Sequence, residues 1–230
     1  MSTGSDAIET VRAALAPHGL FVRGIVSGQY HPSLMPETGI EPDIGCILLI
    51  GTKGGSNWPS FRSWQGGQPD CGGLHPLDQW SKAVINPIAA AVHARVWFPS
   101  DPPFQPFQQW AKVAEGLKPS PLGILIHPDY GLWHSYRAAL GFGFDAAVDP
   151  VTPPVHPCDT CVLKPCMTVC PAKAINSSGF DLLPCRQHLS TEAGRTGCRQ
   201  SGCFSRNACP AGANWRYSAD QIQFHMAALG

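Results

Sequence analysis

The chain has 230 residues, of which 43% are hydrophobic, and its formal net charge is zero. Its length allows one substantial domain and a smaller one, and its seven tryptophans and ten phenylalanines argue against a disordered chain. Charged residues make up only 14%, so the strongly basic surface of a nucleic-acid-binding protein is not expected.

The start of the chain and its apolar runs bear on location. No apolar run reaches the roughly 18–20 residues of a membrane span. The first residues (MSTGSDAIETVRAAL) lack the basic start and apolar stretch of a signal peptide. We therefore expect a cytoplasmic protein without a membrane partner. Disulfides are rare in that compartment, so the ten cysteines indicate metal or cluster ligation.

Helical and extended segments alternate along the first 145 residues. Asp6 and Glu9 predict a capping box at the start of a helix that ends near Pro17. The expected strands are residues 20–26, 44–50, 94–98 and 122–127. The expected helices are residues 77–91, 107–116 and 131–140, with a kink or break at Pro87 in the first of these. Residues 27–43 and 62–76 are expected to be loops.

The run at residues 44–50 (IGCILLI) is apolar throughout, as in a strand buried on both faces. Cys46 within it is expected to be a buried core thiol. Cys71 lies in a glycine-rich loop, and we expect it to be exposed and to have no functional role. The alternation of strands and helices predicts an α/β or α+β domain.

The chain changes character at a proline-rich stretch (DPVTPPVHP). Eight of the ten cysteines follow it within 52 residues. Ser218 and Gln221 then predict a second capping box and a C-terminal docking helix. The predicted organisation is an α/β domain over residues 1–148, a linker over 149–157, a cysteine module over 158–217 and a helix over 218–230.

The eight clustered cysteines form two groups of four, and in each group the last cysteine precedes a proline. The first group has the spacing C-x2-C-x4-C-x3-C-P, and the second has intervals of twelve, four and five residues. The groups are Cys158, Cys161, Cys166 and Cys170, then Cys185, Cys198, Cys203 and Cys209. A [4Fe–4S] cube takes four thiolates, three of which a tight loop can supply.

Over residues 158–210 this pattern resembles bacterial-type two-cluster ferredoxins, in which the cysteine before the proline ligates the other cluster. The resemblance implies a ferredoxin-like module with crossed ligands. Cluster one would take Cys158, Cys161, Cys166 and Cys209, and cluster two would take Cys170, Cys185, Cys198 and Cys203. The intervals are longer than in those ferredoxins, so one cluster on the first group and a zinc site stay as alternatives.

Four arginines lie among or just after the cysteines: Arg195, Arg199, Arg206 and Arg216. They would offset the negative charge of the clusters or serve as ordinary surface residues.

The order of an α/β domain and a two-cluster module is similar to the layout of epoxyqueuosine reductases and reductive dehalogenases. Those are corrinoid enzymes in which clusters feed electrons to a cobalamin held by a nitroreductase-like domain. The resemblance implies that this chain passes electrons from a redox partner protein to a cofactor, cobalamin or flavin, or to a small-molecule substrate. The low basic charge disfavours a tRNA substrate. A dedicated electron carrier and a zinc-stabilised binding module are the alternatives.

Two segments of the first domain are candidates for a pocket. One is the glycine-rich turn at residues 51–58, where Gly54, Gly55 and Trp58 are candidate cofactor-binding residues, although the turn lacks the closing Lys-Ser/Thr of a P-loop. The other is residues 126–134 (IHPDYGLWH), expected at a strand-to-helix turn, where open α/β sheets bind ligands.

In the second segment, His127 is a candidate cofactor-binding residue, and Tyr130 or His134 is a candidate proton donor. A plain structural turn is the alternative for both segments. The aromatic stretch at residues 97–110 would line a flat cofactor or cover the sheet.

Overall fold

The computed structural model describes residues 4–37, 39, 43–148 and 151–229. Its contacts divide the chain into two compact units. The first comprises Met1–Gly116 and Ser135–Pro153, and the second comprises Leu117–His134 and Pro154–Gly230. Within the described ranges, no helix combines the length and the apolar character needed to cross a membrane.

The first unit is built on a four-stranded sheet in the order β1-β2-β6-β3. The strands are β1 (Phe21–Ser27), β2 (Cys46–Lys53), β3 (Arg95–Trp97) and β6 (His134–Phe142). β1 pairs antiparallel with β2, and β3 pairs antiparallel with β6. Every residue of β2 except Lys53 is buried, which confirms the prediction of a strand covered on both faces.

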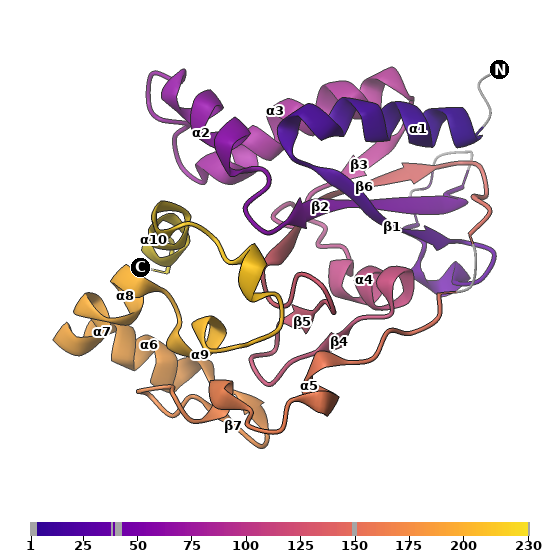
Figure 1. Ribbon diagram of the computed structural model, residues 1–230. Coiled ribbons are helices and arrows are strands. Elements are labelled where there is room, and N and C mark those ends of the chain that lie inside the picture. The colour runs from indigo at the N-terminus through magenta and orange to yellow at the C-terminus, as the bar shows by residue number, and fades with distance from the viewer. Residues whose placement is uncertain (1–3, 38, 40–42, 149–150, 230) are drawn as a thin grey trace. The chain divides into compact units, whose positions relative to one another are not determined.

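Three helices contact the strands of this sheet: α1 (Gly4–Leu15), α3 (Pro76–Ala91) and α4 (Phe107–Glu115). A further helix, α2 (Trp58–Gly66), packs against α3. Figure 1 shows α1 and α3 on one side of the sheet and α4 on the other. Short 3-10 turns lie at Ala16–His18 and Pro32–Leu34. Large side chains from the helices fill the core, and Phe61, Trp80 and Trp110 are fully buried. Burial of such rings is a major source of stability.

One expected element has the wrong type. The helix expected over residues 131–140 is instead β6, which pairs with β2 and β3 in the middle of the sheet. Its Arg137–Leu140 segment favours a helix in isolation, but burial between two strands decides its conformation.

Several expected boundaries also shift. α1 begins at Gly4, so Asp6 lies in its first turn and not before its first residue, where the N-cap was expected. The loop expected from residue 62 is helical to Gly66, and α3 is one helix despite Pro87. The strand expected over residues 122–127 shrinks to two residues. The loop expected over residues 27–43 lies partly outside the described residues.

The second unit consists of short helices and two small hairpins. The hairpins are β4 (Lys118–Pro119) with β5 (Leu125–Ile126) and β7 (Ile175–Asn176) with β8 (Gly179–Phe180). The helices are α5 (Pro157–Thr160), α6 (Leu182–Ser190), α7 (Glu192–Thr196), α8 (Cys198–Ser201), α9 (Phe204–Asn207) and α10 (Ala219–Ala227). Further 3-10 turns lie at Pro165–Met167 and Ala213–Trp215.

The C-terminal helix α10 contacts α8. A Cβ at Gly202, just after α8, would lie 2.8 Å from the Ile222 side chain, so glycine allows the close approach. The second capping box is wrong, because the Ser218 hydroxyl donates to the Asp220 carboxylate at 2.5 Å instead of capping the helix.

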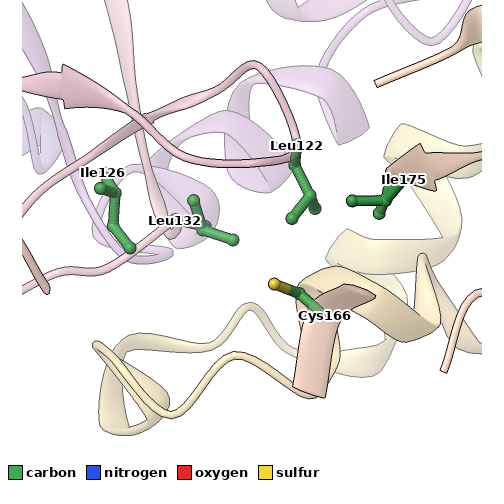
Figure 2. Close-up of a cluster of buried hydrophobic side chains, with 5 residues drawn as sticks. All are labelled: Leu122, Ile126, Leu132, Cys166 and Ile175. Carbon is green, nitrogen blue, oxygen red and sulfur yellow. The ribbon is translucent and has the colours of Figure 1, made fainter. Parts of the chain in front are cut away.

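Contacts place residues 117–134 with the cysteine-rich part of the chain, whereas the predicted boundaries put them in the first domain. The reason is an apolar cluster (Figure 2) in which Leu122, Ile126 and Leu132 pack with Cys166 and Ile175. Of the predicted linker, residues 149 and 150 lie outside the described residues, and residues 151–156 have no regular secondary structure.

Candidate functional site

Four thiols of the second unit surround a small cavity. They are Cys158, Cys161, Cys166 and Cys209, and they share its lining with Pro157, Pro165, Pro210 and Ile126 among others. Burial, followed by the charges of the other three thiols, raises the pKa of Cys158 to about 11. Burial also raises the pKa of Cys166 and of Cys209, and both again respond to neighbouring thiols of this set. Cys209 thus joins three cysteines more than 40 positions away in the chain.

The other four clustered thiols form a second set. Burial raises the pKa of Cys185, with smaller contributions from the charges of Cys203, Cys170 and Cys198. Burial likewise raises the pKa of Cys198, to which Cys203 and Cys170 also contribute. Cys170 follows the first three cysteines of its own sequence group, yet it interacts electrostatically with the second set. The two sets therefore exchange one cysteine each relative to their order in the sequence.

Backbone amides point at several of these sulfur atoms. The amide of Ala174 donates to the Cys170 Sγ at 3.4 Å. Hydrogen bonds from the amides of Phe204 and Ala211 lower the pKa of Cys198 and Cys209, against the larger effect of burial. Such bonds favour the thiolate, which is the form that binds iron.

A set of four thiols matches a [4Fe–4S] cluster and a four-cysteine zinc site in donor type, and the two differ in how far apart the sulfurs stand. Among the described residues, no three His, Cys, Asp or Glu side chains are grouped so that they could hold one metal ion. Four sulfurs around one zinc ion at 2.3 Å would lie ~3.8 Å apart. The four cysteines of a [4Fe–4S] cube each bind a different iron, so they stand farther apart around a larger object.

The four arginines of this region are held by backbone carbonyls. Arg206 donates to the carbonyl of Leu132 at 2.7 Å and stacks over the rings of Trp133 and Tyr217. The other three donate to carbonyls of the same unit: Arg195 to Ser190, Arg199 to Leu189 and Arg216 to Asn207. These hydrogen bonds link the short helices and turns of the unit. They are compatible with the arginines also offsetting the negative charge of thiolates.

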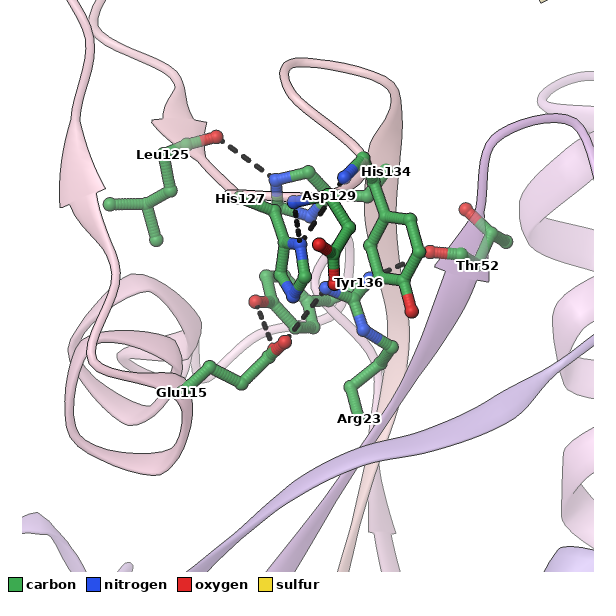
Figure 3. A network of polar contacts seen from close by, with 9 residues as sticks. Arg23, Thr52, Glu115, Leu125, His127, Asp129, His134 and Tyr136 are labelled. Atoms are coloured by element: carbon green, nitrogen blue, oxygen red, sulfur yellow. Dashed lines mark hydrogen bonds and ion pairs between the residues drawn. The ribbon is translucent and has the colours of Figure 1, made fainter. Parts of the chain in front are cut away.

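The turn at residues 127–131 holds two of the predicted site residues. The Nδ1 of His127 accepts hydrogen bonds from the amides of Asp129 and Tyr130 at 3.0 and 3.3 Å (Figure 3). Its ring stacks on the Tyr130 ring at 4.1 Å, and Tyr130 meets Trp215 edge to face at 4.9 Å. The turn leads into a strand and not into a helix, so the expected strand-to-helix geometry is wrong.

This turn is packed against the segment that follows Cys209. Gly131 has a φ of 56°, and a Cβ there would collide with the carbonyl of Ala211. Gly212 meets the backbone of Tyr130 in the same way. Two glycines thus allow two backbones to touch, which holds His127 and Tyr130 beside the chain of the first thiol set.

His134 belongs to the same region but is buried. Its Nε2 donates to the carbonyl of Leu125 at 3.0 Å, and its ring lies 6.1 Å from that of His127 (Figure 3). The structure therefore brings together three of the predicted residues, His127, Tyr130 and His134. Their roles in binding and proton transfer stay predictions.

The glycine-rich turn at residues 51–58 belongs to the first unit. The amides of Ser56 and Trp58 donate to carbonyls within the turn, and the Ser56 hydroxyl donates to the carbonyl of Gly19 at 2.7 Å. Gly54 has a φ of 57°, as a tight turn requires, and Trp58 is buried against Phe61. The ligand-binding role of Gly54, Gly55 and Trp58 stays a prediction.

The aromatic stretch and the two outlying cysteines have structural positions. Trp110 packs against Trp97 and Phe107 in the core of the first unit, which favours a cover for the sheet. Cys46 is fully buried, and burial raises its pKa to about 12, which confirms a core thiol. Cys71 is exposed, as expected.

A buried ionic network escaped the sequence analysis. The Arg23 guanidinium pairs with the Glu115 carboxylate at 2.8 Å and donates to the carbonyl of Thr52 at 2.6 Å (Figure 3). The Tyr136 hydroxyl donates to the other Glu115 oxygen at 2.5 Å. Burial and the adjacent carboxylate raise the pKa of Tyr136. An arginine within an apolar strand (FVRGIVS) was the one signal in the sequence.

Comparisons with known proteins give matches in structure only. No protein-family model and no curated protein matches the sequence. The C. elegans B12-trafficking protein CblC superposes with a TM-score of 0.58 at 14% identity, over 96% of this chain and 91% of that one. An epoxyqueuosine reductase bound to a tRNA stem loop gives a TM-score of 0.54 at 12% identity, over 94% and 66%.

Epoxyqueuosine reductase from Bacillus subtilis gives a TM-score of 0.53 at 12% identity, over 92% of this chain and 66% of that one. This chain thus spans nearly all of CblC and about two thirds of the reductases. It shares the mixed α/β fold of a B12-trafficking protein and of epoxyqueuosine reductase.

Proposed function

We propose that this chain is an iron–sulfur redox protein whose two thiol sets each hold a [4Fe–4S] cluster. The observation that carries the proposal is the exchange of Cys209 and Cys170 between the two sets. Such an exchange is the ligand pattern of two-cluster ferredoxins.

The proposed ligands are Cys158, Cys161, Cys166 and Cys209 for cluster one, and Cys170, Cys185, Cys198 and Cys203 for cluster two. When bound, such clusters supply one-electron storage and transfer. The chain's part is to hold them and to exclude water. Four prolines and Ile126 line the first set, and amides donate to the sulfurs of both sets.

The proposed electron acceptor is a corrinoid. The support is the fold, which this chain shares with a protein described as B12-trafficking and with a reductase. A flavin and a small-molecule substrate are the other acceptors to test. Tyr130 is the proton donor that we propose, because it is only half buried, whereas His134 is buried and donates to Leu125.

The test of the clusters is iron and sulfide analysis of protein prepared or reconstituted without oxygen. We expect about eight irons per chain, and about four after Cys209→Ser or Cys170→Ser. If the ligands cross, Cys209→Ser and Cys158→Ser remove the same electron paramagnetic resonance signal of the reduced protein, and Cys170→Ser and Cys198→Ser remove the other. Cys71→Ser, an exposed thiol outside both sets, is the matched control.

Two results would overturn this reading. One is colourless protein that contains zinc and no iron under oxygen-free conditions. The other is loss of the same signal in Cys209→Ser and Cys203→Ser, which would place both residues on one cluster. Hydroxocobalamin titration, followed by its visible absorption, tests the acceptor separately.

A second candidate function is a dedicated electron carrier between partner proteins. It is favoured by the two residues that follow Cys161, because Val162 is 92% and Leu163 is 84% exposed. Apolar side chains this exposed next to a cluster ligand suit transient docking of a redox partner. Iron-loaded protein that binds neither cobalamin nor flavin would favour the carrier.

A further inference from the structure

The first unit contains a cavity that none of the features above uses. It has a volume of about 340 Å³, within the range of small-molecule sites. Residues of β1, α4 and the segment after β6 line it, chief among them Ile25, Ser27, Lys112, Val113, Val148 and Val151. All of them belong to the first unit, so the cavity is separate from both thiol sets.

The cavity lies where β1 and α4 face each other. At Gly24 the two elements approach so closely that a Cβ would lie 2.9 Å from the Ala114 Cβ. The next residues of β1 include Ile25 and Ser27, which line the cavity together with Lys112 and Val113 of α4. Tyr30, His31, Gly116 and Pro153 complete the lining, and the surface of the wall is mostly apolar, so it favours an apolar ligand body.

Ser27 also lines the cavity, and its hydroxyl lacks a hydrogen-bond partner among the described residues. The residue is only 1% exposed. Buried hydroxyls are nearly always hydrogen-bonded, and this one lines a cavity. The oxygen of a ligand in the cavity can supply that partner.

Lys112 adds a positive charge to the same wall. Three other cations of this unit have carboxylate partners: Arg23 has Glu115, Lys82 has Asp101 and Arg137 has Asp78. Lys112 is half buried, and no ion pair joins it to a carboxylate among the described residues. Its apolar stem can follow the aliphatic wall while its ammonium meets an anion.

We propose that this cavity binds a small monocarboxylate with an apolar body about the size of one aromatic ring. The carboxylate pairs with Lys112, and one of its oxygens accepts a hydrogen bond from Ser27. The aliphatic side chains of Ile25, Val113 and Val148 enclose the ring. This binding site is independent of the proposed clusters, because it uses residues of the first unit only.

The test uses phenylacetate as the probe and phenylacetamide as its neutral counterpart, with the full-length chain. We expect saturable calorimetric binding of phenylacetate, weakened about tenfold by Lys112→Met and several-fold by Ser27→Ala. Phenylacetamide should bind wild type and Lys112→Met equally. Lys118→Met, which removes an exposed lysine outside the cavity, should leave the affinity for phenylacetate unchanged.

Val113→Trp fills the cavity and should abolish binding of both probes, with thermal unfolding measured to show that the variant is folded. As a check that needs no variant, the methyl resonances of Val113 and Ile25 should shift on titration with phenylacetate. Absence of saturable binding up to about 10 mM overturns the proposal. Binding that survives Val113→Trp, or that does not distinguish Lys112→Met from Lys118→Met, overturns it as well.

Discussion

Glu115 is the residue on which the polar interior of the first unit depends. It accepts from both Arg23 and Tyr136, and the Arg23 and Glu115 side chains are only 1% and 7% exposed. Taking such a pair out of water costs free energy that only good geometry offsets. Tyr136 keeps its proton because its pKa is raised, so it remains a hydrogen-bond donor at every ordinary pH.

Removing the Arg23 side-chain charge should therefore lower the free energy of unfolding more than removing the Tyr136 hydroxyl. Arg23→Met leaves the Glu115 carboxylate buried without its cation, and we expect a loss of about 3–5 kcal/mol in the free energy of unfolding. Tyr136→Phe removes one neutral donor and should cost about 1–2 kcal/mol. Urea unfolding followed by circular dichroism measures both. Equal losses would show that the charge of Arg23 adds nothing beyond a hydrogen bond.

Single residues also show how far sequence reasoning reaches. The resemblance to two-cluster ferredoxins implied that Cys170 and Cys209 exchange between the two groups, and the thiols that interact electrostatically follow the same grouping. That they ligate clusters stays a prediction. The partners of Arg23 were not predictable, since Glu115 lies 92 positions away and only the fold brings it near. His134 was expected in a pocket, but it is buried because its strand lies in the sheet.

At the scale of elements, the contact of two turns holds the candidate site together. Gly131 and Gly212 let the turn at residues 127–131 touch the chain after Cys209. Because this contact is backbone to backbone, no side chain can relax to relieve a larger residue. The position of the first thiol set thus depends on a glycine 27 positions before its first cysteine.

Gly131→Ala should accordingly lower the iron content of anaerobically reconstituted protein and its thermal stability. Gly123→Ala is the matched control, because Gly123 also has a positive φ (75°) but no atom lies within 4 Å of the added Cβ. The control should carry only the backbone strain, about 1–2 kcal/mol. Similar iron content in both variants would mean that the contact with Ala211 does not support the thiol set.

Element type was predictable where burial and local pattern agree. The apolar run of β2 and the Pro-bounded helix α3 are examples. β6 was not predictable, because its Arg-Ala-Ala-Leu segment favours a helix and only pairing with β2 and β3 reverses that preference. The predicted mixed α/β class is still correct despite this error. The order of the strands in the sheet could not be predicted from the sequence.

At the scale of the whole molecule, the chain passes between its two units three times. It enters the second unit at Leu117, returns at Ser135 and enters again at Pro154. The excursion carries Leu122, Ile126 and Leu132, which pack with Cys166 and Ile175. The predicted boundary at residues 149–157 marks only the last of these passages, because composition changes there and not at the first two.

A truncated chain of residues 1–157 should therefore be poorly soluble. Without Cys166 and Ile175, the three apolar residues of the excursion lose their cover and become a site for association. Light scattering and binding of a hydrophobic dye, compared with full-length protein, measure the effect. A monomeric, dye-negative fragment would show that the excursion folds without the cysteine-rich part.

The triple passage also limits how this protein can have changed over time. A gene segment that starts at the proline-rich boundary encodes the cysteines but not the excursion that packs against Cys166. Recombination at that boundary would transfer an incomplete unit to a new host protein. The excursion and the cysteine-rich segment should therefore be inherited together. A substitution in one of them should be accompanied by compensating substitutions in the other.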